Sequence, residues 1–242
     1  WGLGALDNAS GNACAVELAR ILAPLASDMR RSVRFVLWSG HSHGRYAGST
    51  AWCDAHFEEL ERHCLLNVNS DCLGGRGATA MTEAPAMAST RGLARTALRE
   101  AAGVTDWRGC RFSRSCDQSF WGAGVPSIFS QVSEQPPFEG AAADAFGKMF
   151  GSGRTGGFGA WWHTRTDTPD KLDPENLARD VRVFASVLAH ALFDERLPVD
   201  AAAEVLELRD ELKAWQEKAG DSLDLSEVLA RLDLLAEALK AA

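Results

Sequence analysis

The order of apolar and polar positions divides residues 1–195 into short apolar runs and longer periodic stretches. Short apolar runs predict strands at residues 33–38, 65–69, 78–82 and 125–131. Apolar residues that recur every three or four positions predict helices at residues 13–26, 50–63, 90–102 and 174–193. Strands that alternate with helices indicate an α/β fold in which helices cover both faces of a sheet, a three-layer sandwich.

The remaining residues, 196–242, show a different pattern. Residues 199–218 and 223–241 are rich in Ala, Leu and Glu with helical periodicity, and residues 219–222 combine a helix stop with a helix cap. This pattern predicts a C-terminal helical hairpin, separate from a domain at residues 1–195. Its apolar faces can pack either on that domain or on a second subunit, so a homodimer through these helices is one of two open alternatives.

Composition excludes several classes of partner and metal site. The formal net charge of −8 argues against nucleic acid as a partner, because binding phosphates requires a basic surface. No apolar run approaches the roughly 20 residues that span a membrane, so we expect no membrane partner. The six cysteines form no CxxC pair, which argues against a thiolate metal cluster.

Cysteine usage and the first residues bear on the cellular compartment. Cys110 and Cys116 flank a short basic loop and could form a disulfide in an oxidising compartment. We favour free thiols in a cytoplasmic protein over a secreted one. Because the chain begins at Trp1 and its first eleven residues resemble the middle of a domain, we expect a piece of a longer chain, whose missing targeting signals are not informative.

Polar side chains of metal-binding type follow apolar runs or lie in Gly-bounded loops at four places. His41 and His43 lie in the turn after residues 33–38, and Asp7, Asp71 and His163 occupy the other three places. Each has an ordinary interpretation alone, as a turn residue, a helix-terminal acid or a packed histidine. Carboxylates and imidazoles at the carboxyl ends of strands together suit a zinc site, and an Asp can bridge two ions in a hydrolase.

Four segments carry motifs in a fixed order. Residues 4–11 read Gly-Ala-Leu-Asp-Asn-Ala-Ser-Gly, and residues 69–74 read Asn-Ser-Asp-Cys-Leu-Gly. Residues 115–126 contain Ser-Cys-Asp-Gln-Ser-Phe and then Gly-Val-Pro, and residues 162–173 contain Trp-His-Thr followed by three aspartates. Together these segments resemble the co-catalytic di-zinc exopeptidases, the family of bacterial aminopeptidases, glutamate carboxypeptidase and the transferrin receptor.

The resemblance implies a zinc-exopeptidase fold with a mixed, mostly parallel β-sheet between helices. It implies one or two zinc ions held by Asp7, Asp71 and His163, and hydrolysis of a peptide or small amide by a metal-activated water. We expect the substrate pocket to draw on residues 104–124 and on a mobile excursion at residues 132–160. Its candidate substrate-binding residues are Asp117, Phe120 and Trp121.

The chain departs from the family in two places. The family's first metal-binding histidine falls before Trp1. The family's Glu-Glu pair, one general base and one metal ligand, is replaced here by the turn His41-Ser42-His43. A histidine can act as general base at neutral pH and can also bind zinc. We therefore predict His41 as the base and His43 as a ligand, with the opposite assignment also open.

Three functions remain open. The first is an active metallo-exopeptidase that uses imidazole in place of the Glu pair, favoured because Asp7, Asp71 and His163 are present. The second is an inactive relative that binds a partner, favoured by the missing pair and the helical tail. The third is a single-metal enzyme with altered chemistry, like the glutaminyl cyclases that share this fold.

Overall fold

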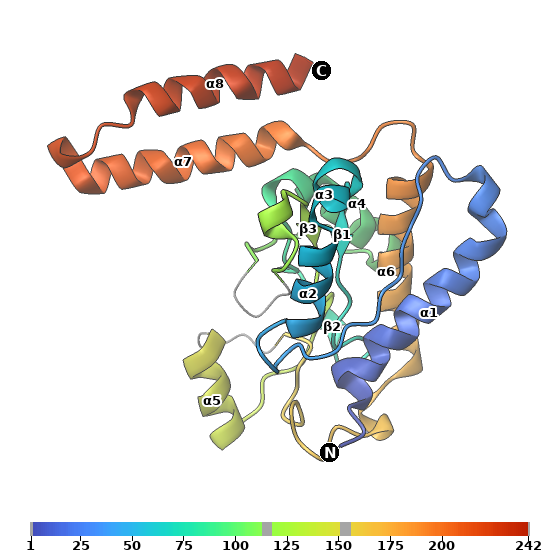
Figure 1. Cartoon of the computed structure of the whole chain (residues 1–242). Helices are drawn as coiled ribbons and strands as arrows, with labels where there is room; N and C mark the ends of the chain where they lie inside the picture. Colours follow the sequence, from blue (N-terminus) through green and yellow to red (C-terminus); the bar gives the residue numbers. More distant parts are fainter. Residues whose placement is uncertain (1, 113–117, 151–155, 242) are drawn as a thin grey trace.

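The computed structural model describes residues 2–112, 118–150 and 156–241. Figure 1 shows helices gathered around a few short strands, with a pair of helices extending away from the rest. In chain order the elements are α1 (Gly11–Leu22), α2 (Ala47–Ala55), α3 (Phe57–His63), β1 (Asn67–Val68), β2 (Thr79–Ala80), α4 (Arg91–Ala102), β3 (Ser127–Ile128), β4 (Ser133–Glu134), α5 (Ala141–Phe150), α6 (Pro174–Phe193), α7 (Ala201–Ala219) and α8 (Ser226–Ala241).

The described strands form two small sheets. β1 pairs in parallel with β3, with Val68 opposite Ile128, and β2 pairs antiparallel with β4, with Thr79 opposite Glu134. The described strands thus include one parallel and one antiparallel pair, in separate sheets. The parallel pair determines where the carboxyl ends of its strands lie, and Asp71 lies three residues after the end of β1.

Helices cover both faces of the parallel pair, which gives the expected three layers. On one face, Ile128 and Phe129 belong to the main apolar core, which they share with α1, α4 and α6. The Phe129 and Phe184 rings pack edge to face, 6.0 Å apart, and burying each contributes about 1.5–3 kcal/mol. On the other face, α2 and α3 form a second core with Phe120 and Val125.

Helix α6 begins where its sequence predicts. The Asp173 carboxylate accepts hydrogen bonds from the backbone amides of Glu175 and Asn176, and Pro174 occupies the first turn. Such a cap stabilises a helix by about 1 kcal/mol. Asp180, Val183, Phe184 and Val187 are buried on the inner face of α6. α6 therefore brings both apolar residues and one buried carboxylate into the core.

Three elements differ from the sequence prediction. Residues 33–38 are extended, but they belong to no strand and are only partly buried. The predicted helix at residues 50–63 is broken at His56, whose backbone (φ −123°, ψ 21°) is not helical, so it becomes α2 and α3. Residues 132–160, expected to be an irregular excursion, contain β4 and α5.

The C-terminal hairpin packs on itself and touches the body at one place. α7 begins at Asp200, whose amide donates to the Ser89 carbonyl, and the Glu204 carboxylate accepts a hydrogen bond from the Ser89 hydroxyl. Ser89 lies just before α4 and has the chemistry of a helix cap, but here it anchors α7 instead. Glu207 and Glu211 add ion pairs with arginines of the body, Arg91 and Arg111. Figure 1 shows the hairpin extending beyond these contacts.

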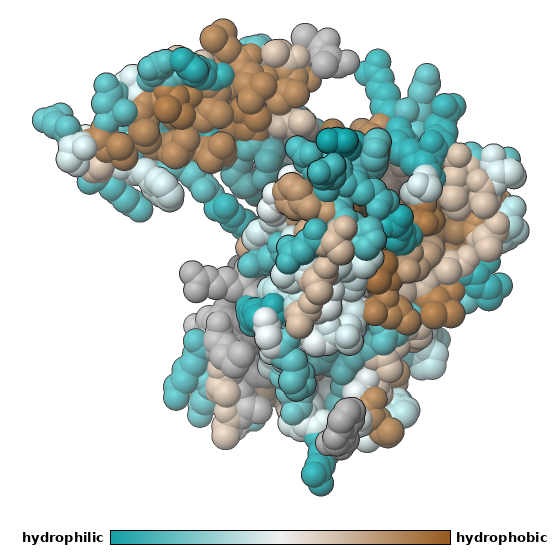
Figure 2. Space-filling model, in the orientation of Figure 1, coloured by the Kyte–Doolittle hydropathy of each residue, from teal (hydrophilic) through white to brown (hydrophobic). Residues whose placement is uncertain are grey.

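Part of the hairpin surface is apolar. Leu208 and Trp215 of α7 and Leu235 of α8 are about half exposed. Figure 2 shows a broad hydrophobic surface across both helices. Within the described part of the chain, no helix combines the length and the apolar character needed to cross a membrane.

Candidate metal centre

Asp167 holds the loop that carries Asp7. The Asp167 carboxylate, buried to 2% exposure, accepts hydrogen bonds from the backbone amides of Leu6 (2.8 Å) and Asp7 (2.9 Å). Ser10 closes the loop from the other side, since its hydroxyl donates to the Leu6 carbonyl at 2.7 Å. The peptide bond between Asp7 and Asn8 is cis. These contacts fix the backbone of Asp7, whose side chain reaches the carboxyl end of β1.

Asn8 joins this loop to the one after β1. Its side-chain amide donates to the Ser70 carbonyl at 2.9 Å, and its side-chain carbonyl accepts from the amides of Gly11 and Cys72. The hydroxyl of Ser10 also accepts a hydrogen bond from the Leu73 amide at 2.9 Å. The loops containing Asp7 and Asp71 are thus held side by side although they lie far apart in the sequence.

A buried carboxylate supports the second loop from below. The Asp180 side chain, at 0% exposure, accepts hydrogen bonds from the Gly74 amide (2.8 Å) and the Ser133 hydroxyl (2.5 Å), and it pairs with Arg179 at 2.9 Å. Gly74 has φ +71°, and a side chain there would overlap Leu177 of α6. The close approach of α6 therefore requires glycine at position 74.

The two loops bring three possible ligands together. Ligand atoms of Asp7, Asp71 and Cys72 all lie within 4.8 Å of one another. His163 extends the cluster, because its Nε2 lies 3.0 Å from Oδ2 of Asp7. The structure thus brings together Asp7, Asp71 and His163, three of the residues that the sequence predicts as metal ligands. Cys72 was not predicted as a ligand.

The electrostatics of the cluster suit a cation. Burial, reinforced by the negative charge of Asp7, raises the pKa of the Asp71 carboxyl to about 7. The same causes, burial first and then Asp71, raise the pKa of the Cys72 thiol well above its ordinary value. Oδ1 of Asp71 is buried and has no hydrogen-bond partner within the described residues. An orphaned buried carboxylate oxygen is costly unless a proton or cation satisfies it, so the donor set fits a metal ion.

His163 is positioned by aromatic neighbours. Its ring stacks on Trp162 with the two ring centroids 3.5 Å apart, and Trp162 in turn contacts Phe158. The His163 backbone has φ +57°, a left-handed conformation that turns the chain after the tryptophan pair. Half of its side chain remains exposed, so it is accessible from solvent while it contacts Asp7.

His41 and His43 lie elsewhere. Both are exposed on the turn between Gly40 and Gly44, and neither joins Asp7 and Asp71 in a group of ligand atoms within 4.8 Å in the described part of the chain. The His41 ring packs against Tyr46 with the ring centroids 4.9 Å apart. Their predicted roles as base and ligand therefore remain predictions.

Two of the three candidate substrate-binding residues, Phe120 and Trp121, pack against neighbouring residues. Phe120 is buried beside Trp38 and Trp52, and the Trp121 indole donates a hydrogen bond to the Ser127 hydroxyl at 3.3 Å. Asp117 and Cys116 lie outside the described residues, so substrate binding by Asp117 and the Cys110–Cys116 disulfide remain predictions. Substrate contacts by Phe120 and Trp121 are likewise untested.

Sequence reasoning missed Cys72. It lies next to the predicted ligand Asp71, is fully buried and has φ +53°. Its place directly after the predicted ligand Asp71 is the signal in the sequence that could have drawn attention to it. Its chemistry alone did not, because single buried thiols are common in apolar cores.

Fold and cluster together define a helix-covered α/β protein with a carboxylate cluster at the end of a parallel strand. The sequence model of peptidase family M28 matches residues 1–188. The chain belongs to this family. Asp7, Asp71 and His163 all lie within the matched residues.

Individual relatives agree on the fold. An aminopeptidase from Aneurinibacillus sp. strain AM-1 superimposes with a TM-score of 0.59 at 23% identity, over 81% of this chain and 42% of its own. BSAP, a zinc aminopeptidase from Bacillus subtilis, gives 0.56 at 20% identity, over 80% and 43%. A protein described as probable glutamate carboxypeptidase VP8, from Zea mays, is 33% identical over 75 residues, which is 30% of this chain and 10% of that protein. The chain thus spans less than half the length of these relatives.

Proposed function

We propose that this chain carries part of the centre of a zinc-dependent metallopeptidase of aminopeptidase type, which hydrolyses a peptide or small amide. The observation that carries the proposal is the buried Oδ1 of Asp71, which lacks a partner in the described part of the chain and belongs to the same cluster as Asp7. Two carboxylates and an imidazole are a donor set that zinc accepts. The printed description of BSAP as a zinc aminopeptidase supports the choice of metal.

Each residue of the cluster has a separate role in this proposal. Asp7 and Asp71 hold one or two zinc ions, and Asp167 keeps Asp7 in place through its backbone amide. His163 adds a nitrogen ligand, oriented by its stack on Trp162. When bound, zinc lowers the pKa of its water and polarises the scissile carbonyl. The proposal gives His41 the role of general base and His43 that of a metal ligand, or the reverse, and either role would require the exposed turn to reach the cluster.

A second function is favoured by one observation. His41 and His43 are exposed and outside the carboxylate cluster, and residues 33–49 contain no Glu that could act as the base. An inactive family member that binds a partner agrees with this arrangement. The active and inactive proteins differ in turnover and can share metal binding, so the two properties must be measured separately.

The test measures zinc content and hydrolysis on the same preparation. The purified protein is dialysed against zinc, freed of loose metal and assayed by elemental analysis and with aminoacyl p-nitroanilides. Bound zinc with turnover supports the peptidase, and bound zinc without turnover supports the inactive alternative. Absence of stoichiometric zinc in the folded protein would contradict the zinc-dependent peptidase and favour the inactive, partner-binding protein.

The hairpin and the cysteines support two further parts of the proposal. Exposed apolar residues of α7 and α8 (Leu208, Trp215 and Leu235) form a surface that a second hairpin would cover in a homodimer. Cys14, Cys53 and Cys72 are buried thiols, which supports a reducing, cytoplasmic location.

A further inference from the structure

One extended segment of the chain has no backbone partner. Figure 1 shows residues 32–38 as a drawn-out length of chain outside every helix and strand, and none of their amides or carbonyls forms a backbone hydrogen bond with any described residue. Their side chains are strongly apolar, with Val33, Phe35 and Val36 partly buried and Leu37 56% exposed. Extended apolar backbone without a ladder is unusual, because backbone groups in a fold are nearly always paired.

β1 is paired along one edge only. The Asn67 amide donates to the Pro126 carbonyl at 2.9 Å, and the Asp71 amide donates to the Ser130 carbonyl at 2.8 Å. Successive residues of a strand direct their backbone groups to opposite edges, so Val68 directs its amide and carbonyl away from β3. No described backbone group meets Val68 on that side.

A hollow of about 730 Å³ separates these two unpaired edges. Residues 30–36 line it on one side, and residues 64–68 line it on the other. Its two remaining walls are apolar: Leu18 of α1 and Phe184 and Leu188 of α6 form one, and Trp52 and Leu60 form the other. The hollow thus lies in the layer of the sheet, between the helices that cover the two faces.

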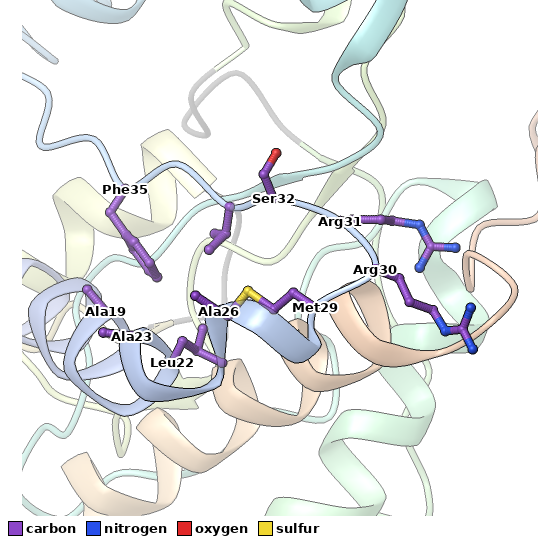
Figure 3. A pocket seen from close by; sticks show the side chains of 10 residues that line it. Ala19, Leu22, Ala23, Ala26, Met29, Arg30, Arg31, Ser32 and Phe35 are labelled. Carbon is purple, nitrogen blue, oxygen red and sulfur yellow. The ribbon is translucent and has the colours of Figure 1, made fainter.

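A smaller hollow of about 430 Å³ lies along the same segment. Figure 3 shows it between Phe35, Met29 and residues of α1 such as Ala19 and Leu22. Residues 30–35 therefore border open space against α1 as well as against β1. Open space on both sides is expected for a segment that has no neighbouring strand in the layer of the sheet.

We propose that the larger hollow is the seat of an additional β-strand that runs parallel to β1. The strand would pair with residues 32–38 on one edge and with Val68 on the other. Because helices cover both of its faces, it would be a continuous run of Val, Ile or Leu type, as in buried parallel strands. The inference is independent of the proposed function, since it rests on backbone pairing.

The occupant we assign is polypeptide of the same protein outside residues 1–242. The solved relatives match this chain over only 42% and 43% of their own lengths, so most of their chains have no counterpart here. Ser70 lines one end of the hollow, and the Asn8 side chain donates a hydrogen bond to the Ser70 carbonyl. That end of the hollow is therefore close to the loop of Asp7. A strand parallel to β1 would therefore end beside the carboxylate cluster.

Amide hydrogen exchange tests the proposal. It compares the protein as encoded by its complete gene with residues 1–242 produced alone. We expect the amide of Val68, and the alternate amides of residues 33–37 that face the hollow, to exchange at least about tenfold more slowly in the longer protein, since these amides gain a hydrogen bond. The amides of Met81 and Phe129, which already donate to Val132 and Pro85, serve as controls that stay protected in both.

Two variants separate backbone pairing from side-chain packing. Val68→Pro removes the amide that faces the hollow, and Val68→Ala removes only side-chain contacts. The proposal requires Val68→Pro to lower the free energy of unfolding of the longer protein more than Val68→Ala does. In residues 1–242 alone, the difference between the two variants should be smaller. Fast exchange of Val68 and of every amide from 33 to 37 in the complete protein overturns it, whether or not residues 1–242 fold alone. A gene product that consists of residues 1–242 only, or protection that requires a second copy, also overturns it.

Discussion

Nε2 of His163 lies 3.0 Å from Oδ2 of Asp7, although Asp7 lies at the start of the domain and His163 follows the last described strand. Asp167 brings these two side chains together. Its carboxylate binds the backbone amide of Asp7, and Asp167 itself lies only a few residues after His163 in the chain. The segment 163–167 therefore supplies both a possible ligand and the support for a second one. The two side chains are therefore close enough to contact one cation.

The first prediction concerns these two residues. His163→Ala and Asp7→Asn should each reduce zinc affinity by at least about tenfold, because each removes one ligand from a small donor set. Isothermal titration with zinc measures the change. His63→Ala is the matched control, since His63 is an exposed histidine at the end of α3. Unchanged zinc affinity in both variants would contradict the assignment of this cluster.

The second prediction distinguishes the two histidines of the turn. If His41 is the base and His43 a ligand, His41→Ala abolishes turnover with zinc content unchanged, whereas His43→Ala lowers both. The reverse pattern exchanges the two roles. Elemental analysis and aminoacyl p-nitroanilide hydrolysis are measured on each variant. If neither variant alters zinc content or turnover, both roles are wrong.

The helices and the cluster could largely be predicted because they depend on local pattern. α6 carries its own signals, an Asp173 cap and Pro174 at the first turn. Asp7, Asp71 and His163 follow from motifs, and the structure brings them together. The family match also confirms the predicted resemblance.

What failed depends on distant partners. Residues 33–38 have a strand pattern and extended backbone, but a strand requires a neighbour that local sequence does not specify. Ser89 has the chemistry of a helix cap, yet its hydroxyl binds Glu204 from the tail. The burial of Cys72 likewise depends on loops that meet only in the folded protein.

The third prediction concerns the buried carboxylate below the cluster. Asp180→Ala should lower the free energy of unfolding by about 3–5 kcal/mol, because it leaves Arg179 unpaired and removes an acceptor from the Gly74 amide. Urea denaturation measures the loss. Arg20→Ala breaks the exposed pair with Glu17 and should change the free energy of unfolding far less, because solvent screens this pair. Similar effects of the two variants would contradict the supporting role of Asp180.

The fourth prediction concerns the hairpin. Leu235→Glu should shift the protein from dimer to monomer, because a charge placed in an apolar interface must be desolvated. Sedimentation velocity at several concentrations measures the change. Leu25→Glu is the control, since Leu25 is comparably exposed but lies far along the chain from the hairpin. A wild-type protein that remains monomeric at high concentration would exclude the homodimer.

The fifth prediction concerns pH and the contact between α4 and α6. His190 of α6 lies 2.8 Å from Asp194 and 3.2 Å from Glu100 of α4. Its hydrogen bond to Asp194, with a further contribution from Glu100, raises the pKa of His190 above the ordinary 6.5. A hydrogen bond from His190 lowers the pKa of Glu100 below 4.5.

The signs of these two shifts define a pH window. Because its pKa is raised in the fold, His190 contributes stability that is fully present below pH 6.5. This contribution is lost as pH rises through the raised pKa. A lowered carboxyl pKa stabilises the fold above pH 4.5 and is lost as pH falls. The contact should therefore contribute most between these values, by about 0.5 kcal/mol after screening of these partly exposed groups.

Urea denaturation at pH 5.5 and pH 8.5 tests this window. His190→Gln should destabilise the protein at pH 5.5 and much less at pH 8.5, because wild-type His190 is neutral at the higher pH. His63→Gln, in an exposed histidine of α3, should have equal small effects at both values. Equal destabilisation by His190→Gln at the two pH values would show that His190 acts through packing, and that its charge does not join α4 to α6.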